Sequence, residues 1–125
     1  MEPKVTVVLP FYNAEETLNR AIESISEQDF RNFECILVNN NSTDKSTGIA
    51  NTWTRRDKRF RLIHEPEQGV VFASNTGACY ATGKYIARMD ADDWAYPDRL
   101  TLQTFFLENH PEYGAVGGLA KYVHP

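Results

Sequence analysis

The segment YIARMDADDW, residues 85–94, ends an apolar run with three closely spaced aspartates, Asp90, Asp92 and Asp93. Two carboxylates about 5 Å apart repel each other by roughly 3 kcal/mol at an effective dielectric constant near 20. A divalent cation relieves this repulsion, because Mg²⁺ and Mn²⁺ bind oxygen ligands and commonly join one or two carboxylates to substrate phosphates. The Asp90-x-Asp92 pattern therefore suits a metal ion that bridges the protein and a diphosphate.

A solvated acidic turn is the alternative explanation, with Asp93 capping the segment that follows. For an isolated Asp-x-Asp pattern we favour this simpler explanation. Side chains in a strand alternate, so we expect Asp90 and Asp92 to point to one side of the sheet and Asp93 to the other. The choice between site and turn then depends on which other polar residues lie beside the carboxylates.

The elements that position these aspartates alternate between strand and helix along the chain. Apolar, β-branched runs are typical of strands buried in a parallel sheet, and they cover residues 4–10, 33–40, 60–65 and 84–90, with a shorter run at 113–118. Helical patterns cover residues 13–28, a segment ending near residue 56, residues 70–83 and residues 96–111. This alternation predicts an α/β domain with a mostly parallel sheet.

Capping residues indicate where the predicted helices begin and end. Asn13 is an N-cap candidate, and Glu16, three residues later, completes a capping box. Gly83 is a natural C′ residue for the third helix. Pro97 lies near the start of the fourth helix and Pro111 beyond its end.

Polar residues follow three of the predicted strands, at the point where each strand ends. Tyr12 and Asn13 follow the first strand, Asn39–Asn41 the second and Asp90–Asp93 the fourth. Ligands of open parallel sheets bind outside the carboxyl ends of the strands, where the strand order reverses. We therefore expect the three clusters to converge on one crevice, which favours a metal site over a solvated turn.

Length and composition limit the class of protein. The 125 residues suit one domain. The 13 basic and 17 acidic residues give a net charge of −4, which argues against a nucleic-acid partner. No apolar run reaches the roughly 18–20 residues of a transmembrane segment, and the N-terminus lacks the layout of a signal peptide. Cys35 and Cys79 lie in apolar stretches, so we expect buried free thiols in a reducing, cytoplasmic compartment.

Two further segments bear on location and completeness. The basic run RRDKR at residues 55–59 is compatible with a peripheral contact to the inner face of a membrane. We favour the simpler interpretation, a solvated helix end. The final residues, GLAKYVHP, look like the start of another strand. We therefore expect the chain to be the first part of a longer domain, truncated on its C-terminal side.

Several nucleotide-binding and hydrolase signatures are absent from the sequence. It has no G-x-x-x-x-G-K-[ST] phosphate loop, no G-x-G-x-x-G after the first strand and no G-x-S-x-G elbow. A phospho-receiver domain needs its acidic pair after the first strand, whereas the aspartates here follow the fourth. P-loop NTPases, dinucleotide-binding domains and α/β-hydrolases are thus disfavoured.

Three stretches together cover nearly the whole chain: VTVVLPFYNAEETLNRAIESI, FECILVNNNSTDKS and EQGVVFASNTGACYATGKYIARMDADDWAYPDRLTLQ. Together they resemble the family 2 glycosyltransferases of the GT-A fold. The resemblance implies a Rossmann-like, mostly parallel sheet flanked by helices, with residues 1–125 as a single domain that forms the N-terminal, donor-binding portion of a catalytic domain. It implies that a sugar is transferred, with inversion, from a nucleotide-diphosphate donor, most often a UDP-sugar. The acceptor implied is a hydroxyl of a saccharide or a lipid-linked molecule, in polysaccharide biosynthesis.

The same resemblance gives roles to individual positions. The residues implied are Pro10, Phe11, Tyr12, Asn39, Asn40, Asn75 and Asp90 for the nucleotide-sugar, and Asp90 and Asp92 for a bound Mn²⁺ or Mg²⁺. A surface role on its helix is an equal alternative for Asn75. The general base of the family is a carboxylate from the later part of the domain, so we expect it beyond Pro125.

The chain departs from the family pattern in two places. Asn39-Asn40-Asn41 stands where the family most often has Asp-Asp-Gly, and Ser74 stands where it often has arginine. An asparagine amide both donates and accepts, so Asn40 can still pair with uracil, but the identity of the base stays open. Asn41 fits a left-handed turn in place of glycine.

Two other classes of function stay open. The Asn39-Asn40 pair and the missing base are compatible with a module that binds a nucleotide-sugar or saccharide without turnover. A receiver-like signalling domain is the third hypothesis. An acyl-phosphate mimic that leaves the spectrum of the Asp90–Asp93 region unchanged excludes the receiver domain, and turnover by the full-length protein separates an enzyme from a binding module.

Overall fold

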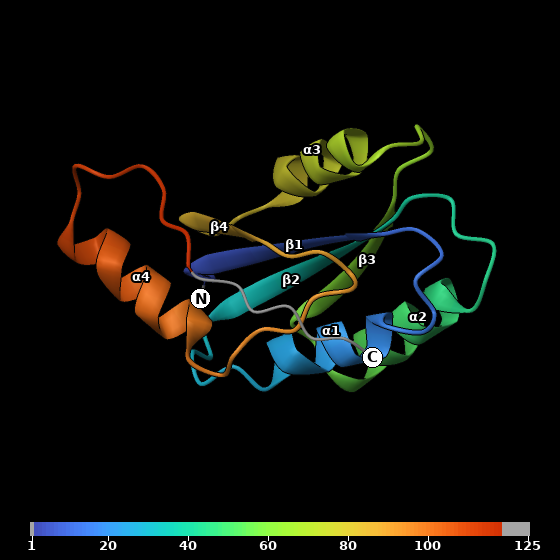
Figure 1. The fold of residues 1–125 in the computed structure, drawn as a ribbon, viewed down its shortest axis with the longest axis horizontal. Coiled ribbons are helices and arrows are strands. Elements are labelled where there is room, and N and C mark those ends of the chain that lie inside the picture. Colours follow the sequence, from blue (N-terminus) through green and yellow to red (C-terminus); the bar gives the residue numbers. More distant parts are fainter. Residues whose placement is uncertain (1, 119–125) are drawn as a thin grey trace.

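The structure is a computed structural model that describes residues 2–118 of the chain. In this part of the chain the strands are β1 Val5–Phe11, β2 Phe33–Asn39, β3 Phe60–His64 and β4 Tyr85–Arg88. The helices are α1 Leu18–Ser26, α2 Ser46–Arg56, α3 Val70–Tyr80 and α4 Arg99–Asn109. All strand pairs are parallel, in the order β3-β2-β1-β4 (Figure 1), which confirms the predicted α/β architecture.

Helices cover both faces of the sheet. Figure 1 shows α1 and α2 below the sheet and α3 above it. Every residue of β1 is buried, because Val7 and Leu9 belong to the core cluster shared with α1 and α2, whereas Val8 packs with Ala73 of α3. The α3 helix lies very close to the sheet: a Cβ atom on Gly77 would lie 2.4 Å from Cγ1 of Val8.

The order of the strands sets the position of the site. The chain runs from β1 outward to β2 and β3, then returns to the other side of β1 to form β4. Strand order therefore reverses between β1 and β4, and the carboxyl ends of these two neighbours flank the place where such sheets bind ligands.

The fourth strand is shorter than predicted. It ends at Arg88, so Asp90–Asp93 lies in a turn rather than in the strand. The predicted short strand at residues 113–118 is wrong, because these residues form irregular backbone with a bend at Gly114. The proposed further strand at residues 119–125 lies outside the residues that the structure describes.

Two predicted helix caps are also wrong. Helix α1 begins at Leu18, and Asn13 has a left-handed φ of 46° with its side chain bonded to another loop. Helix α3 ends at Tyr80, and Gly83 instead packs against β1, where a Cβ atom would lie 2.6 Å from the backbone nitrogen of Thr6. Gly83 is therefore required for close packing and not for capping.

The cysteines differ from each other in burial. Both are free thiols, as predicted, but Cys79 is exposed on α3. Cys35 is buried, and this burial raises the pKa of its thiol well above its usual value. Among the described residues, no helix has the length and apolar character needed to cross a bilayer.

Candidate functional site

A pocket of about 280 Å³ lies between the loops that follow β1 and β4. It is lined by Pro10, Phe11, Tyr12, Asn13, Ala14, Thr17, Asp90, Ala91 and Asp92. The predicted Pro10–Tyr12 segment and the predicted metal ligands thus line one cavity at the reversal of strand order. Tyr12 is an exposed aromatic residue, with 53% of its surface accessible, and it borders the cavity.

The aspartates after β4 form a tight turn. The Asp93 backbone N–H donates a hydrogen bond to the Asp90 carbonyl oxygen at 3.1 Å. Side-chain oxygens of Asp90, Asp92 and Asp93 all lie within 4.8 Å of one another, and all three residues are exposed. The predicted alternation that sends Asp93 to the opposite side is wrong, because the strand has already ended.

These carboxylates fit a hard divalent cation. Six oxygen ligands at about 2.1 Å from Mg²⁺ lie roughly 3 to 4.2 Å from each other, so small side-chain rotations bring oxygens within 4.8 Å onto one ion. Mutual repulsion also has a visible effect: burial, followed by the charges of Asp92 and Asp90, raises the pKa of the Asp93 carboxyl above its usual value. A cation bound here supplies the charge that the cluster lacks.

Buried neighbours hold the acidic turn in place. Met89 and Ala91 are buried on either side of Asp90, so the backbone is fixed while the carboxylates face outward. The turn continues into a segment held by α1: Ser24 Oγ accepts from the Ala95 N–H at 3.1 Å. Gln28, fully buried, donates to the Tyr96 carbonyl oxygen at 2.6 Å.

The loop after β1 is held by the loop after β2. Asn13 Oδ1 accepts from the Thr43 N–H at 2.8 Å, and the Asn13 N–H donates to Ser42 Oγ at 3.0 Å. Ala14 N–H donates to Ser46 Oγ at 2.8 Å. Tyr12 and Asn13 therefore occupy fixed positions beside the acidic turn.

Asn39 and Asn40 lie next to this pocket but outside its lining. Asn39 is paired with Phe11 in the sheet, and the Asn40 N–H donates to the Phe11 carbonyl oxygen at 2.9 Å. The two residues are 7% and 3% exposed; the Asn39 side chain contacts His64 at the end of β3, and the Asn40 side chain contacts the loop that follows β3. Asn41 has a φ of 71°, which confirms the left-handed turn predicted for this position.

Although position 74 is a serine, an arginine from β4, Arg88, lies beside it. Arg88 donates from Nη2 to Ser74 Oγ at 3.1 Å, and the same nitrogen lies 3.8 Å from Asp90 Oδ1. Sequence reasoning missed Arg88, because its position just before the acidic turn gave no sign that it reaches α3. Asn75 lies on the exposed side of α3 and does not line the pocket.

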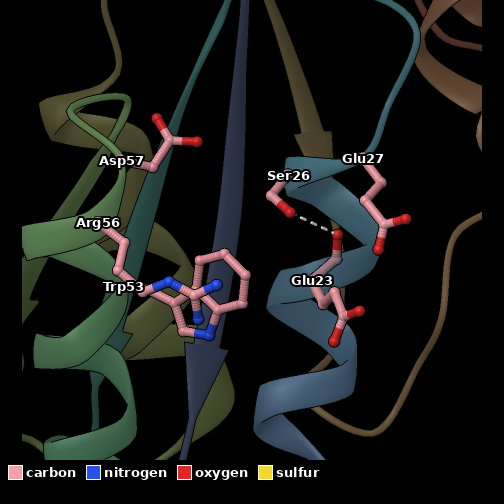
Figure 2. Close-up of a pocket in the computed structure, with 6 residues that line it drawn as sticks. All are labelled: Glu23, Ser26, Glu27, Trp53, Arg56 and Asp57. Atoms are coloured by element: carbon pink, nitrogen blue, oxygen red, sulfur yellow. Dashed lines mark hydrogen bonds between the residues drawn. The ribbon is translucent and has the colours of Figure 1, made fainter.

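A larger cavity of about 380 Å³ lies between α1 and α2, lined by the residues labelled in Figure 2. The Arg56 guanidinium carbon lies 4.3 Å from the centre of the Trp53 ring. Ser26 Oγ donates a hydrogen bond to the Glu23 carbonyl oxygen. These residues belong to the C-terminal halves of the helices, which in a parallel α/β sheet lie at the amino ends of the strands. The cavity is therefore on the opposite edge from the acidic turn.

Comparison with known proteins identifies the family. The sequence model of Glycosyl transferase family 2 matches residues 6–124. The chain is 43% identical over 117 residues to EpsE of Bacillus subtilis, covering 92% of this chain and 42% of that protein. It is 42% identical over 110 residues to an uncharacterized glycosyltransferase of Haemophilus influenzae, covering 86% and 44%. The chain spans less than half the length of these curated relatives.

Solved structures agree with the sequence matches. TarS of S. aureus, solved with UDP-GlcNAc, has a TM-score of 0.77 and 25% identity over 86% of this chain and 32% of that chain. The mannosyltransferase PcManGT of Pyrobaculum calidifontis, solved with GDP-Man and Mn²⁺, has a TM-score of 0.77 and 30% identity over 86% and 33%. The chain therefore has the GT-A fold and belongs to glycosyl transferase family 2.

Proposed function

We propose that this chain is the donor-binding part of a glycosyltransferase that moves a sugar from a nucleotide-diphosphate donor to an acceptor hydroxyl. The observation that carries the proposal is the single pocket that joins Pro10–Tyr12 to Asp90 and Asp92. This pocket lies at the reversal of strand order, where parallel sheets bind nucleotides. The relatives and the nucleotide-sugar complexes of similar proteins support the same class of donor.

Within the pocket we assign Tyr12 to the nucleobase and ribose, and the acidic turn to the diphosphate. Asp90 and Asp92 are the proposed ligands of Mn²⁺ or Mg²⁺, and Asp93 is close enough to assist. When bound, the cation stabilises the negative charge that develops on the departing diphosphate. A UDP-sugar is the preferred donor, inversion the expected stereochemical course, and a saccharide or lipid-linked hydroxyl the expected acceptor.

Binding measurements test the donor half directly. Calorimetric titration of the chain with UDP, UDP-GlcNAc and GDP-Man, in Mn²⁺ and in EDTA, should show binding that requires the metal. Uridine, which has no phosphates, should bind weakly and without regard to Mn²⁺. Binding of UDP that is equal in Mn²⁺ and EDTA, or absent in both, contradicts the proposed site.

A non-catalytic module for nucleotide-sugars is the second candidate. It is favoured by the Asn39-Asn40 pair, which replaces the acidic pair of the family with neutral side chains. Release of UDP from a UDP-sugar in the presence of acceptor, measured on the full-length protein, distinguishes the two. Metal-dependent binding without release of UDP supports the module, and acceptor-stimulated release supports the enzyme.

A further inference from the structure

We infer that Asn39–Asn41 form an amide clamp that fixes residues 64–69, and that Asn40 is a positioning residue instead of the reader of the nucleobase. The functional part of this inference rests on the proposed donor site. The clamp itself is a property of the free chain. It accounts for the three asparagines at the point where this chain departs from the family pattern.

Asn40 is fully engaged by the loop after β3. Its Nδ2 donates to the carbonyl oxygens of Glu65 at 2.9 Å and Glu67 at 2.8 Å. Its Oδ1 accepts from the Gly69 N–H at 2.9 Å and from Gln68 Nε2 at 3.4 Å. An amide has two N–H donors and two acceptor positions, so no group of Asn40 is left for a base.

The neighbouring asparagines contact other parts of residues 64–69: Asn39 contacts His64 at the end of β3, and Asn41 contacts the loop that follows. Asn41 Nδ2 donates to the Pro66 carbonyl oxygen at 2.9 Å and to Gln68 Oε1 at 3.3 Å. Asn39 Oδ1 accepts from the Ser42 N–H at 3.0 Å, so its Nδ2 faces His64 Nδ1 at 3.1 Å. Because an amide nitrogen only donates, His64 Nδ1 is the acceptor in this contact.

Every partner of these three amide nitrogens is therefore an acceptor. A carboxylate at position 40 would place one negatively charged oxygen, in the position of Nδ2, against two carbonyl oxygens at about hydrogen-bond distance, which is repulsive. This explains why asparagine, and not the more frequent aspartate of the family, suits this loop. The side chains at positions 39–41 and the loop at 64–69 are complementary as donors and acceptors.

The clamp is linked to the pocket and to α3. The Asn40 N–H donates to the carbonyl oxygen of Phe11, which lines the pocket. Gly69, whose φ of 137° suits glycine, immediately precedes α3 and bonds Asn40 Oδ1. Asn40 thus joins the end of β1 to the start of α3, and its loss should disturb the wall on which a nucleotide rests.

Hydrogen exchange of the free chain tests the clamp without a nucleotide. In Asn40→Asp, amides of residues 64–70 should exchange at least about tenfold faster than in the wild type, because two donors are lost and two repulsive contacts are created. The matched control is Asn51→Asp, which makes the same charge change on an exposed position of α2 and should leave these amides unchanged. Equal exchange in the two variants overturns the clamp.

A second variant removes one arm of the clamp with little risk to folding. Asn41→Gly introduces the residue common in the family at a φ of 71°, where glycine is favoured. It removes the donors to Pro66 and Gln68, so exchange in residues 64–70 should rise about two- to fivefold. Unchanged exchange in Asn41→Gly also counts against the clamp.

Nucleotide binding separates a positioning role from base reading. If Asn40 read the base, Asn40→Asp would keep or improve affinity for UDP, because it restores the family carboxylate. As a clamp residue, Asn40→Asp should weaken UDP binding in Mn²⁺ about tenfold or more at pH near 7.5, with partial recovery near pH 5.5, where a protonated carboxyl again donates to a carbonyl. Asn51→Asp should show neither effect.

The outcomes are distinguishable. Weaker UDP binding with recovery at lower pH supports the inference, and affinity that is retained or raised in Asn40→Asp overturns the positioning role. If the wild type fails to bind UDP in Mn²⁺, the proposed function fails, and the exchange experiment alone decides whether the clamp exists.

Discussion

Asp92 has opposite effects in the free and metal-bound forms of the site. Its carboxylate repels Asp90 and Asp93 in the free chain and contributes a ligand oxygen when a cation binds. Asp92→Asn should therefore raise the thermal midpoint of the metal-free chain slightly, by about 1–4 °C. It should also remove the increase in midpoint that Mn²⁺ produces and weaken UDP binding about 10- to 100-fold, measured by calorimetry.

The control for Asp92→Asn is Asp98→Asn. Asp98 is exposed just before α4 and its side chain makes no capping hydrogen bond, so this variant changes the charge equally without touching the acidic turn. Asp98→Asn should respond to Mn²⁺ as the wild type does. A full Mn²⁺ response in Asp92→Asn would show that Asp92 is not a ligand.

Arg88 lies beside Asp90, which we assign to the diphosphate and its cation. Its side chain is 58% exposed and lies between Ser74 and Asp90, so it can turn toward a bound phosphate. Arg88→Ala should weaken binding of UDP about tenfold and leave binding of uridine unchanged, because only UDP carries phosphates. Arg55→Ala, an exposed change on α2, is the control, and an equal loss for uridine and UDP would contradict a phosphate contact.

Single residues differ in how well the sequence predicts their roles. Asp90 and Asp92 were predicted to meet Pro10–Tyr12 because strand ends converge in a parallel sheet, and they do line one pocket. The bonds of Asn40 were not predictable, because its partners lie 25 to 29 residues later and belong to an irregular loop. No periodic pattern connects two loops of this kind.

At the scale of elements, the contact of α3 with the sheet depends on Gly77. An added Cβ would lie 2.4 Å from Val8 Cγ1 and 3.1 Å from Val38 Cγ2, both in buried strands. Gly77→Ala should therefore lower the free energy of unfolding by about 1–3 kcal/mol, measured by urea denaturation. Its paired control is Gly48→Ala in α2, where no atom lies within 4 Å of the new Cβ.

The control has its own expected sign. Alanine is the better helix former by up to about 1 kcal/mol, so Gly48→Ala should be neutral or stabilising. If both substitutions stabilise the chain equally, helix propensity governs both positions, and α3 is not in tight contact with the sheet.

Strands were easier to predict than helix boundaries in this chain. The buried runs predicted β1–β3 to within about one residue, because strands in a parallel sheet are apolar on both faces. The start of α1 was misplaced because Asn13, a good N-cap by type, bonds Thr43 across the fold instead. Local capping signals fail where a distant loop takes the same side chain.

At the scale of the whole molecule, loop contacts join the carboxyl edge into one network. The loop after β1 bonds Ser42 and Ser46 after β2, and the Asn39–Asn41 segment bonds the loop after β3. The site is therefore held by contacts between loops as well as by the sheet. The sequence predicted that these loops converge, but it did not predict the bonds between them.

On the opposite edge, the Glu108 carboxylate connects α4 to the sheet. Glu108, near the end of α4, pairs with Lys4 before β1 and with Lys84 at 2.8 Å before β4, and it accepts a hydrogen bond from the Tyr85 hydroxyl. These contacts connect the last turn of α4 to the amino ends of two strands. They lower the pKa of Glu108 from its ordinary value of 4.5 to about 2, with the hydrogen bonds from Lys4, Lys84 and Tyr85 as the largest causes.

The lowered pKa of Glu108 predicts how its contribution to the free energy of unfolding depends on pH. A carboxyl whose pKa is lowered on folding stabilises the fold fully above its unfolded value and loses that contribution as the pH falls through the folded value. The difference in unfolding midpoint between wild type and Glu108→Gln should be largest above about pH 4.5 and shrink toward zero near pH 2. Glu112→Gln, exposed beyond α4, should match the wild type at each pH. A difference that stays constant between these pH values would mean that Glu108 acts through packing and not through its charge.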